Sequence, residues 1–210
     1  FTAQQQAKNI QRGRCKMELL NPLISEYTWA NKPSVAPLGQ IICVTDVGEN
    51  GALFRGNGTS WVRMHTVRYY DLPAAVSLTG TTTETTLATL TVKGGLMGAK
   101  GKLKVYPLFG CTNNANNKTF YIKAGGVSFS AILSTTNSVS VQYACIIRNT
   151  NSESSQVSFA SGNPYSVGNS SGAVTTASVN TAADFTLAVS AQLANAGDTF
   201  TLHGLFVEIV

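Results

Sequence analysis

The sequence predicts an all-β protein: an extended arm, a small N-terminal three-stranded meander, and a C-terminal antiparallel β-sandwich that is jelly-roll-like. Strand-like segments recur about every ten residues after Thr79, and clusters of Gly, Asn and Ser separate them, as in a sandwich. Charged residues make up only 12% of the 210 residues, against ~25% in a usual soluble domain. Thr, Ser and Asn take their place, and these residues favour strands and turns over helices.

Residues 1–36 form a basic arm and linker. Its first part carries four positive charges and no negative one, at Lys8, Arg12, Arg14 and Lys16. Two interpretations stay open: a solvated terminus, or an arm that anchors the chain on an acidic surface of another subunit. Nucleic acid is not the expected partner, because no aromatic residue between Lys8 and Lys16 is available to stack on bases.

Residues 37–70 predict the meander, with strands at 40–45, 52–55 and 59–64. The turns between them, at 46–51 and 56–58, are dense in Gly, Asn and Asp. A sheet this small is barely stable alone. We therefore expect it to pack on a neighbouring subunit or on symmetry-related copies of itself.

Residues 79–210 predict the sandwich. Apolar and polar residues alternate along its segments, which places one face of each strand in a core. The longest alternation runs from Val139 to Ile147. The predicted strands lie at 85–92, 103–107, 119–123, 127–133, 139–147, 156–159, 185–189 and 199–210.

The last strand is apolar on both faces. A strict alternation puts Phe200, Leu202 and Phe206 on one face, and Leu205, Val207 and Ile209 on the other. One face fits the sandwich core. We predict that Leu205, Val207 and Ile209 form a contact between copies of the chain; the alternative is a central strand covered by loops of its own chain.

No catalytic or metal-binding residue is predicted, and no cofactor. Residues 168–172 match the nucleophile pattern G-x-S-x-G, but they lie in a polar loop with no helix after them. The two histidines and ten acidic residues are scattered, and the four cysteines are expected to be free thiols. The sequence contains no apolar run of ~18 residues, the length that a membrane-spanning helix requires. We therefore do not expect an enzyme.

Two parts of the chain resemble structural proteins of tailed bacteriophages. The first is the stretch from Pro37 to Val62, with the turns VTDVG and GNGTSW. The second is the C-terminal region, with the segments TGTTTETTLATLTVKGGLMGAKGKLKV, NNANNKT and LANAGDTFTLHGLFVEI. These features are similar to modules of tail fibres and head fibres. The resemblance implies a virion component, made in the host cytoplasm, that is often a homotrimer.

The expected function is therefore a trimeric fibre or spike. Its N-terminal region would anchor it to other virion proteins, such as the capsid, portal or tail. The outward-facing sandwich would contact a host-surface glycan through polar loop residues. The loop candidates are Asn113, Asn114, Asn116, Asn163, Tyr165 and Asn169. The alternative is a capsid decoration or head-fibre protein with a purely stabilising role.

Overall fold

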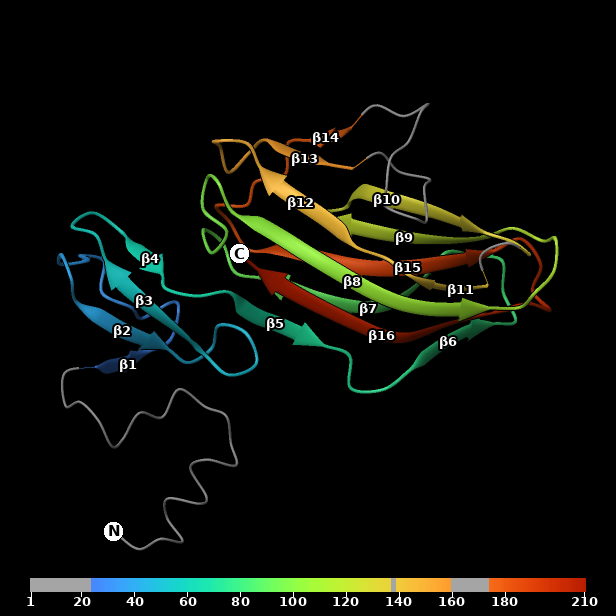
Figure 1. The fold of residues 1–210 in the computed structure, drawn as a ribbon, viewed down its shortest axis with the longest axis horizontal. Coiled ribbons are helices and arrows are strands. Elements are labelled where there is room, and N and C mark those ends of the chain that lie inside the picture. The colour runs from blue at the N-terminus through green and yellow to red at the C-terminus, as the bar shows by residue number, and fades with distance from the viewer. Residues whose placement is uncertain (1–23, 137–138, 160–173) are drawn as a thin grey trace, which may run out of the picture. The chain divides into compact units, whose positions relative to one another are not determined.

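A computed structural model describes residues 24–136, 139–159 and 174–210 (Figure 1). All regular elements within these ranges are strands, so the predicted all-β class is confirmed. The chain divides into two compact units, residues 1–69 and residues 70–210. The anchoring candidates Lys8, Arg12, Arg14 and Lys16 lie outside the described residues, as do Asn163, Tyr165 and Asn169.

The N-terminal unit contains a four-stranded mixed sheet in the order β1 (Ser25–Tyr27), β2 (Ile41–Val44), β3 (Ala52–Gly56) and β4 (Trp61–Arg63). Strands β2 to β4 form the predicted antiparallel meander. Strand β1 was not predicted, because three residues are too few to show an alternation, and it pairs parallel to β2. The sheet buries Ile42, Val44 and Phe54.

Two further contacts stabilise this unit. Trp29 packs against Phe54 with ring centroids 5.4 Å apart, and Trp61 Nε1 donates a hydrogen bond to the Pro33 carbonyl at 2.7 Å. The predicted turn at 56–58 is held by the Asn57 side chain, whose Oδ1 accepts hydrogen bonds from the backbone of the next residues. Gly58 adopts a φ of 95°, which an L side chain disfavours.

The C-terminal unit is built on two antiparallel sheets (Figure 1). The β9–β15 sheet has the order β10 (Val127–Ser134), β9 (Lys118–Ala124), β15 (Phe185–Leu193) and β7 (Thr85–Val92). The β8–β16 sheet has eight strands, among them the two longest of the described chain, β8 (Lys102–Cys111) and β16 (Thr199–Ile209). Its other members are β5 (Val67–Asp71), β6 (Val76–Thr79), β11 (Ser140–Gln142), β12 (Cys145–Asn149), β13 (Gln156–Ser158) and β14 (Thr175–Ala177).

The core lies between these sheets, as the predicted sandwich requires. Phe109 and Phe200 come from the β8–β16 sheet and Phe120 from the β9–β15 sheet, and all three are fully buried. Their rings stack on one another, with centroids 4.8, 4.9 and 5.6 Å apart. Stacked aromatic rings bury large areas and fix the relative position of the strands that carry them.

The predicted long strand at 139–147 is interrupted. Strands β11 and β12 both pair with β8, but residues 143 and 144 between them are not in strand conformation. The alternation still holds, because Val141, Tyr143, Cys145 and Ile147 are all buried. Strands β5 and β6 were not predicted, and β6 pairs with β16.

The predicted oligomer contact on the last strand is wrong. The β16–β8 pairing shifts by one residue between Leu202 and Gly204, which leaves His203 as an extra residue in a bulge. The shift moves Leu205, Val207 and Ile209 onto the same face as Phe200 and Leu202. The three predicted contact residues are 2%, 0% and 0% exposed in a single copy, so they are core residues and do not face another copy.

The cysteines differ from one another. Cys111 and Cys145 are free, as predicted, and burial raises the pKa of the Cys145 thiol to about 11. Cys43 is fully buried on β2 and is disulfide-bonded, so the prediction of a free thiol is wrong there.

Candidate functional site

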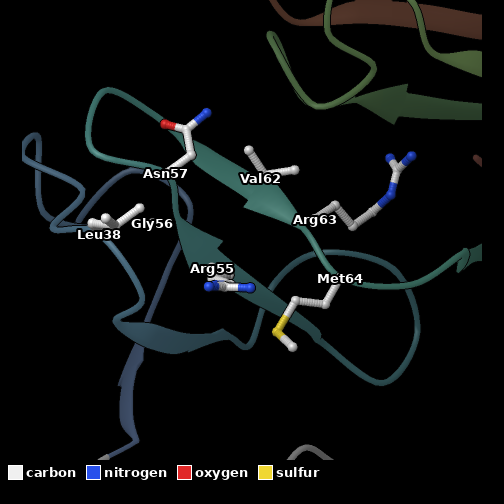
Figure 2. Close-up of a pocket in the computed structure, with 7 residues that line it drawn as sticks. All are labelled: Leu38, Arg55, Gly56, Asn57, Val62, Arg63 and Met64. Atoms are coloured by element: carbon white, nitrogen blue, oxygen red, sulfur yellow. The ribbon is translucent and has the colours of Figure 1, made fainter.

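An open groove of about 490 Å³ lies on the outer face of the N-terminal sheet (Figure 2). We call it the N-terminal groove. Its apolar members are strongly exposed: Leu38 by 77%, Val62 by 48% and Met64 by 48%. Arg55 lies directly opposite Val62 in the β3–β4 ladder, so both project from the same face. The lining residues are Leu38, Arg55, Gly56, Asn57, Val62, Arg63 and Met64, with no acidic residue among them.

Local sequence explains this face. Arg55 and Val62 occupy outward positions of strands whose neighbouring positions, such as Phe54, face the core. Arg63 lies opposite Phe54 in the ladder, so it projects from the other face of β4. It is half-buried, and its burial lowers the pKa of the guanidinium. The resulting surface is aliphatic and positively charged. Such a surface suits a protein partner that is apolar and acidic, because exposed apolar patches mark contact sites and opposite charges select the partner.

A second groove of about 470 Å³ lies on the outer face of the β8–β16 sheet. We call it the sandwich groove. Tyr106 of β8 and Phe206 of β16 are directly opposed in the ladder, and their rings lie 5.8 Å apart at 31°. The lining residues are Asp71, Tyr106, Pro107, Leu108, Gln142, Gly204, Leu205, Phe206 and Glu208. It therefore combines two rings with two carboxylates and one amide.

The bulge at His203 positions this groove. It shifts the alternation of β16 by one residue, so that Gly204, Phe206 and Glu208 face outward while the aliphatic residues face the core. Gly204 lies opposite Leu108, and a Cβ at Gly204 would meet only the Leu108 Cβ, at 3.8 Å. The missing side chain at Gly204 leaves space beside the rings. Glu208 Oε2 lies 4.0 Å from Lys104 Nζ on the neighbouring strand.

In the predicted receptor turn at 113–117, two of the three candidate asparagines have a structural role. The side-chain amides of Asn114 and Asn116 donate to the two carboxylate oxygens of Asp198, at 2.6 and 3.0 Å. These hydrogen bonds, with that from Asn114 first, lower the pKa of the Asp198 carboxyl. Asn113 is the exposed candidate of this turn.

A fully buried lysine completes this cluster. Lys118 occupies an inward position of β9, beside Phe120 in the alternation. Its Nζ donates to the backbone carbonyl and side-chain oxygen of Asn114 and lies 4.0 Å from Asp198 Oδ2. A buried ammonium requires such partners. The turn is therefore fixed in place by its own polar side chains.

The two histidines have different surroundings. His65 accepts a hydrogen bond at Nε2 from the Leu53 backbone, whereas His203 is exposed in the bulge of β16. Within residues 24–136, 139–159 and 174–210, no three His, Cys, Asp or Glu side chains are placed to hold a metal ion. The G-x-S-x-G match at 168–172, which was not expected to be a nucleophile, lies outside these ranges. A helix long and apolar enough to cross a membrane is not found in the described part of the chain.

Comparisons with known proteins identify no family. No family model matches, and no curated protein matches. Among solved structures, dimeric latent PorU from Porphyromonas gingivalis is similar over 68% of this chain and 13% of its own, with 11% identity and a TM-score of 0.32. A chain in the structure of the infectious bursal disease virus Gx strain is similar over 72% of this chain and 43% of its own, with 8% identity and a TM-score of 0.24. This chain thus spans less than half of either structure, and neither likeness bears on its function.

Proposed function

We propose that this chain is a non-enzymatic structural protein of a tailed-bacteriophage particle. It is a homotrimeric fibre or spike, anchored by its N-terminal part to other virion proteins, with the sandwich facing outward. The low charge content and the resemblance of residues 37–62 to phage fibre modules support this proposal. The structural observation that carries it is the N-terminal groove.

The N-terminal groove has the chemistry of a docking surface. Its aliphatic side chains are exposed, and covering them with a partner would bury apolar surface and so favour association. The exposed Arg55 supplies positive charge, and the described lining has no acidic residue. The partner is therefore an apolar and acidic surface of another particle subunit.

Particle incorporation tests the proposal. We expect the double variant Val62→Glu, Met64→Glu to reduce the number of copies per particle at least tenfold, because it places negative charge on the docking surface. Quantitative mass spectrometry of purified particles measures the copies. The matched control is Thr89→Glu, Thr91→Glu, which adds the same charge at two exposed positions of β7. Equal incorporation of both double variants would contradict the docking role.

The mass of the full-length chain in solution tests the homotrimer separately. Light scattering during size-exclusion chromatography is expected to give three times the chain mass of 22.2 kDa. A monomeric mass at micromolar concentration would remove the trimer from the proposal. The anchoring role would then depend on the incorporation result alone.

A further inference from the structure

We infer that the sandwich groove binds a neutral pyranose unit of a glycan. The predicted receptor residues lie on loops, whereas this site lies on the outer face of the β8–β16 sheet, at residues that the sequence analysis did not predict to bind a ligand. The inference rests on the proposed function in one respect, since it takes the sandwich as the outward part of a particle. Its chemistry is argued from the groove itself.

The rings provide a stacking platform. Tyr106 and Phe206 come from adjacent strands that are held in register by a long ladder, so their positions are fixed before any ligand binds. The inclination of 31° between the rings at 5.8 Å makes a continuous, slightly folded apolar surface. One face of a pyranose ring carries mainly C–H groups, and an aromatic face with its negative quadrupole attracts them.

Polar groups surround the platform. Asp71 and Glu208 are acceptors for sugar hydroxyls, and the Gln142 amide both donates and accepts. These groups come from β5, β16 and β11, which lie on different sides of the rings in the sheet. Ligand sites in proteins have this composition, an apolar surface with a few polar groups that fix orientation, and the volume of about 470 Å³ is within their usual range.

The charge of the lining selects among sugars. Two carboxylates and no basic side chain line the groove, and Lys104, opposite Glu208 in the ladder, has its Nζ 4.0 Å from Glu208 Oε2. A second carboxylate or a phosphate on the ligand would meet like charge in a partly desolvated site, which costs binding free energy. The groove therefore fits neutral sugars and disfavours acidic ones.

The absence of a side chain at Gly204 leaves space in the groove. A Cβ there is sterically acceptable, so the fold does not require glycine at this position. A longer side chain would extend from the floor of the groove between Leu108 and Phe206. The glycine is thus explained by the space that it leaves for a ligand.

Saturation-transfer NMR of the full-length chain tests the inference. The probes are methyl α-D-glucopyranoside, methyl α-D-galactopyranoside, methyl α-D-mannopyranoside and the acidic methyl α-D-glucopyranosiduronate. We expect transfer to at least one neutral pyranoside and at least about tenfold weaker binding of the uronate, the loss expected when like charges meet in a partly desolvated site. The same chain on a glycan array is expected to retain neutral glycans in preference to sialylated ones.

Three variants place the binding in the groove. Phe206→Ala removes half of the platform, and Gly204→Leu fills the groove without removing any existing side chain. Both are expected to weaken binding about tenfold or more, as truncation or blocking of a central aromatic contact does. The matched control is Tyr121→Ala, which removes an outward tyrosine from the β9–β15 sheet and is expected to leave binding unchanged.

The outcomes are distinct. No transfer to any neutral pyranoside, together with no neutral glycan on the array, overturns the inference. Equal loss in Phe206→Ala and Tyr121→Ala, or a change of oligomeric mass in Gly204→Leu, also overturns it, the latter by showing that copies meet at the groove. Binding is measured on purified chain, so it does not depend on particle incorporation. A chain that enters particles but binds no sugar keeps the structural role alone.

Discussion

The two grooves are almost equal in volume, about 490 and 470 Å³, but opposite in chemistry. The N-terminal groove presents flexible aliphatic side chains and the exposed Arg55, whereas the sandwich groove presents two rigid rings and two carboxylates. Met64 and Leu38 can adapt to an irregular protein surface. Aromatic rings on two strands held in register by a ladder cannot adapt in this way. They suit a small ligand of fixed shape. The difference agrees with the proposal that one unit attaches the chain and the other recognises a ligand.

The difference also lies in how each groove is supported. The small sheet of the N-terminal unit carries its groove on three antiparallel strands and one short parallel strand. The sandwich groove lies on the eight-stranded β8–β16 sheet, whose inner face buries Val105, Leu205 and Val207 in the core. The same chemical change is therefore expected to have a large effect in the core and a small one in a groove.

The largest effect is expected for a phenylalanine between the sheets. Phe120→Ala removes a fully buried ring that stacks on two others, and should lower the free energy of unfolding by about 3–5 kcal/mol. Phe206→Ala makes the same change in the sandwich groove and should cost less than about 1.5 kcal/mol, since the ring is only partly buried. Urea denaturation measures both. Equal costs would show that Phe206 belongs to the core, and the groove would lose its platform as a separate feature.

This contrast shows where sequence reasoning succeeded. The alternation in residues 103–107, 119–123 and 185–189 correctly places Val105, Phe120 and Leu187 in the core, because period two is a local property of a strand. It fails in β16, because one extra residue at His203 reverses the phase of everything after it. Nothing in the local sequence TLHGLF marks which residue is bulged; the partner strand β8 decides it.

The sandwich groove could not be predicted from the sequence for a related reason. Asp71, Tyr106, Gln142 and Phe206 are separated by up to 135 positions, since 206 − 71 = 135, and only the pairing of four strands brings them to one face. The Asn-rich turn at 113–117 was conspicuous in the sequence, but the side chains of Asn114 and Asn116 donate hydrogen bonds to Asp198. Composition cannot distinguish an amide that binds a ligand from one that fixes a turn. The exposed aliphatic residues of the N-terminal groove likewise became visible only when the ladder showed which side they project from.

An intermediate effect is expected at the outer face of the β9–β15 sheet. Glu84 accepts hydrogen bonds from Lys123 Nζ and Ser190 Oγ, which hold the pKa of its carboxyl below the ordinary value of 4.5. A lowered carboxyl pKa contributes stability that is present above 4.5 and is lost as the pH falls through the folded-state pKa. Glu84→Gln should therefore cost about 0.5–1 kcal/mol at neutral pH.

The pH profile checks the cause. The free energy of unfolding of the parent chain should fall as the pH drops below 4.5, and Glu84→Gln should show a smaller fall because the amide does not titrate. Thr89→Gln, on the same outer face at an exposed position, is the control and should keep the parent profile. Parallel profiles for the parent and Glu84→Gln would assign the acid sensitivity elsewhere, for instance to Asp198, whose pKa is also lowered.

A smaller effect is expected in the N-terminal groove. Val62→Thr keeps a β-branched side chain at a position that is 48% exposed, so the free energy of unfolding should change by less than about 0.5 kcal/mol. The control Phe54→Ala alters a buried residue of the neighbouring strand and should cost about 3–5 kcal/mol. Thermal unfolding followed by circular dichroism measures both. A large cost for Val62→Thr would mean that this side chain serves the fold of its own unit, and the case for a docking surface would weaken.

The smallest effect is expected at Gly204 and tests why a glycine stands in the sandwich groove. A Cβ there meets only the Leu108 Cβ at 3.8 Å, and the backbone does not have a positive φ. Gly204→Ala should therefore cause no loss in the free energy of unfolding, because the lower entropy of the unfolded chain offsets any small local cost. Gly94→Ala is the matched opposite, because its Cβ would lie 2.5 Å from the Ala182 carbonyl oxygen and strongly destabilise the sandwich. Chemical denaturation distinguishes the two. If Gly204→Ala is as damaging as Gly94→Ala, the fold itself demands this glycine, and its presence ceases to be a sign of a ligand.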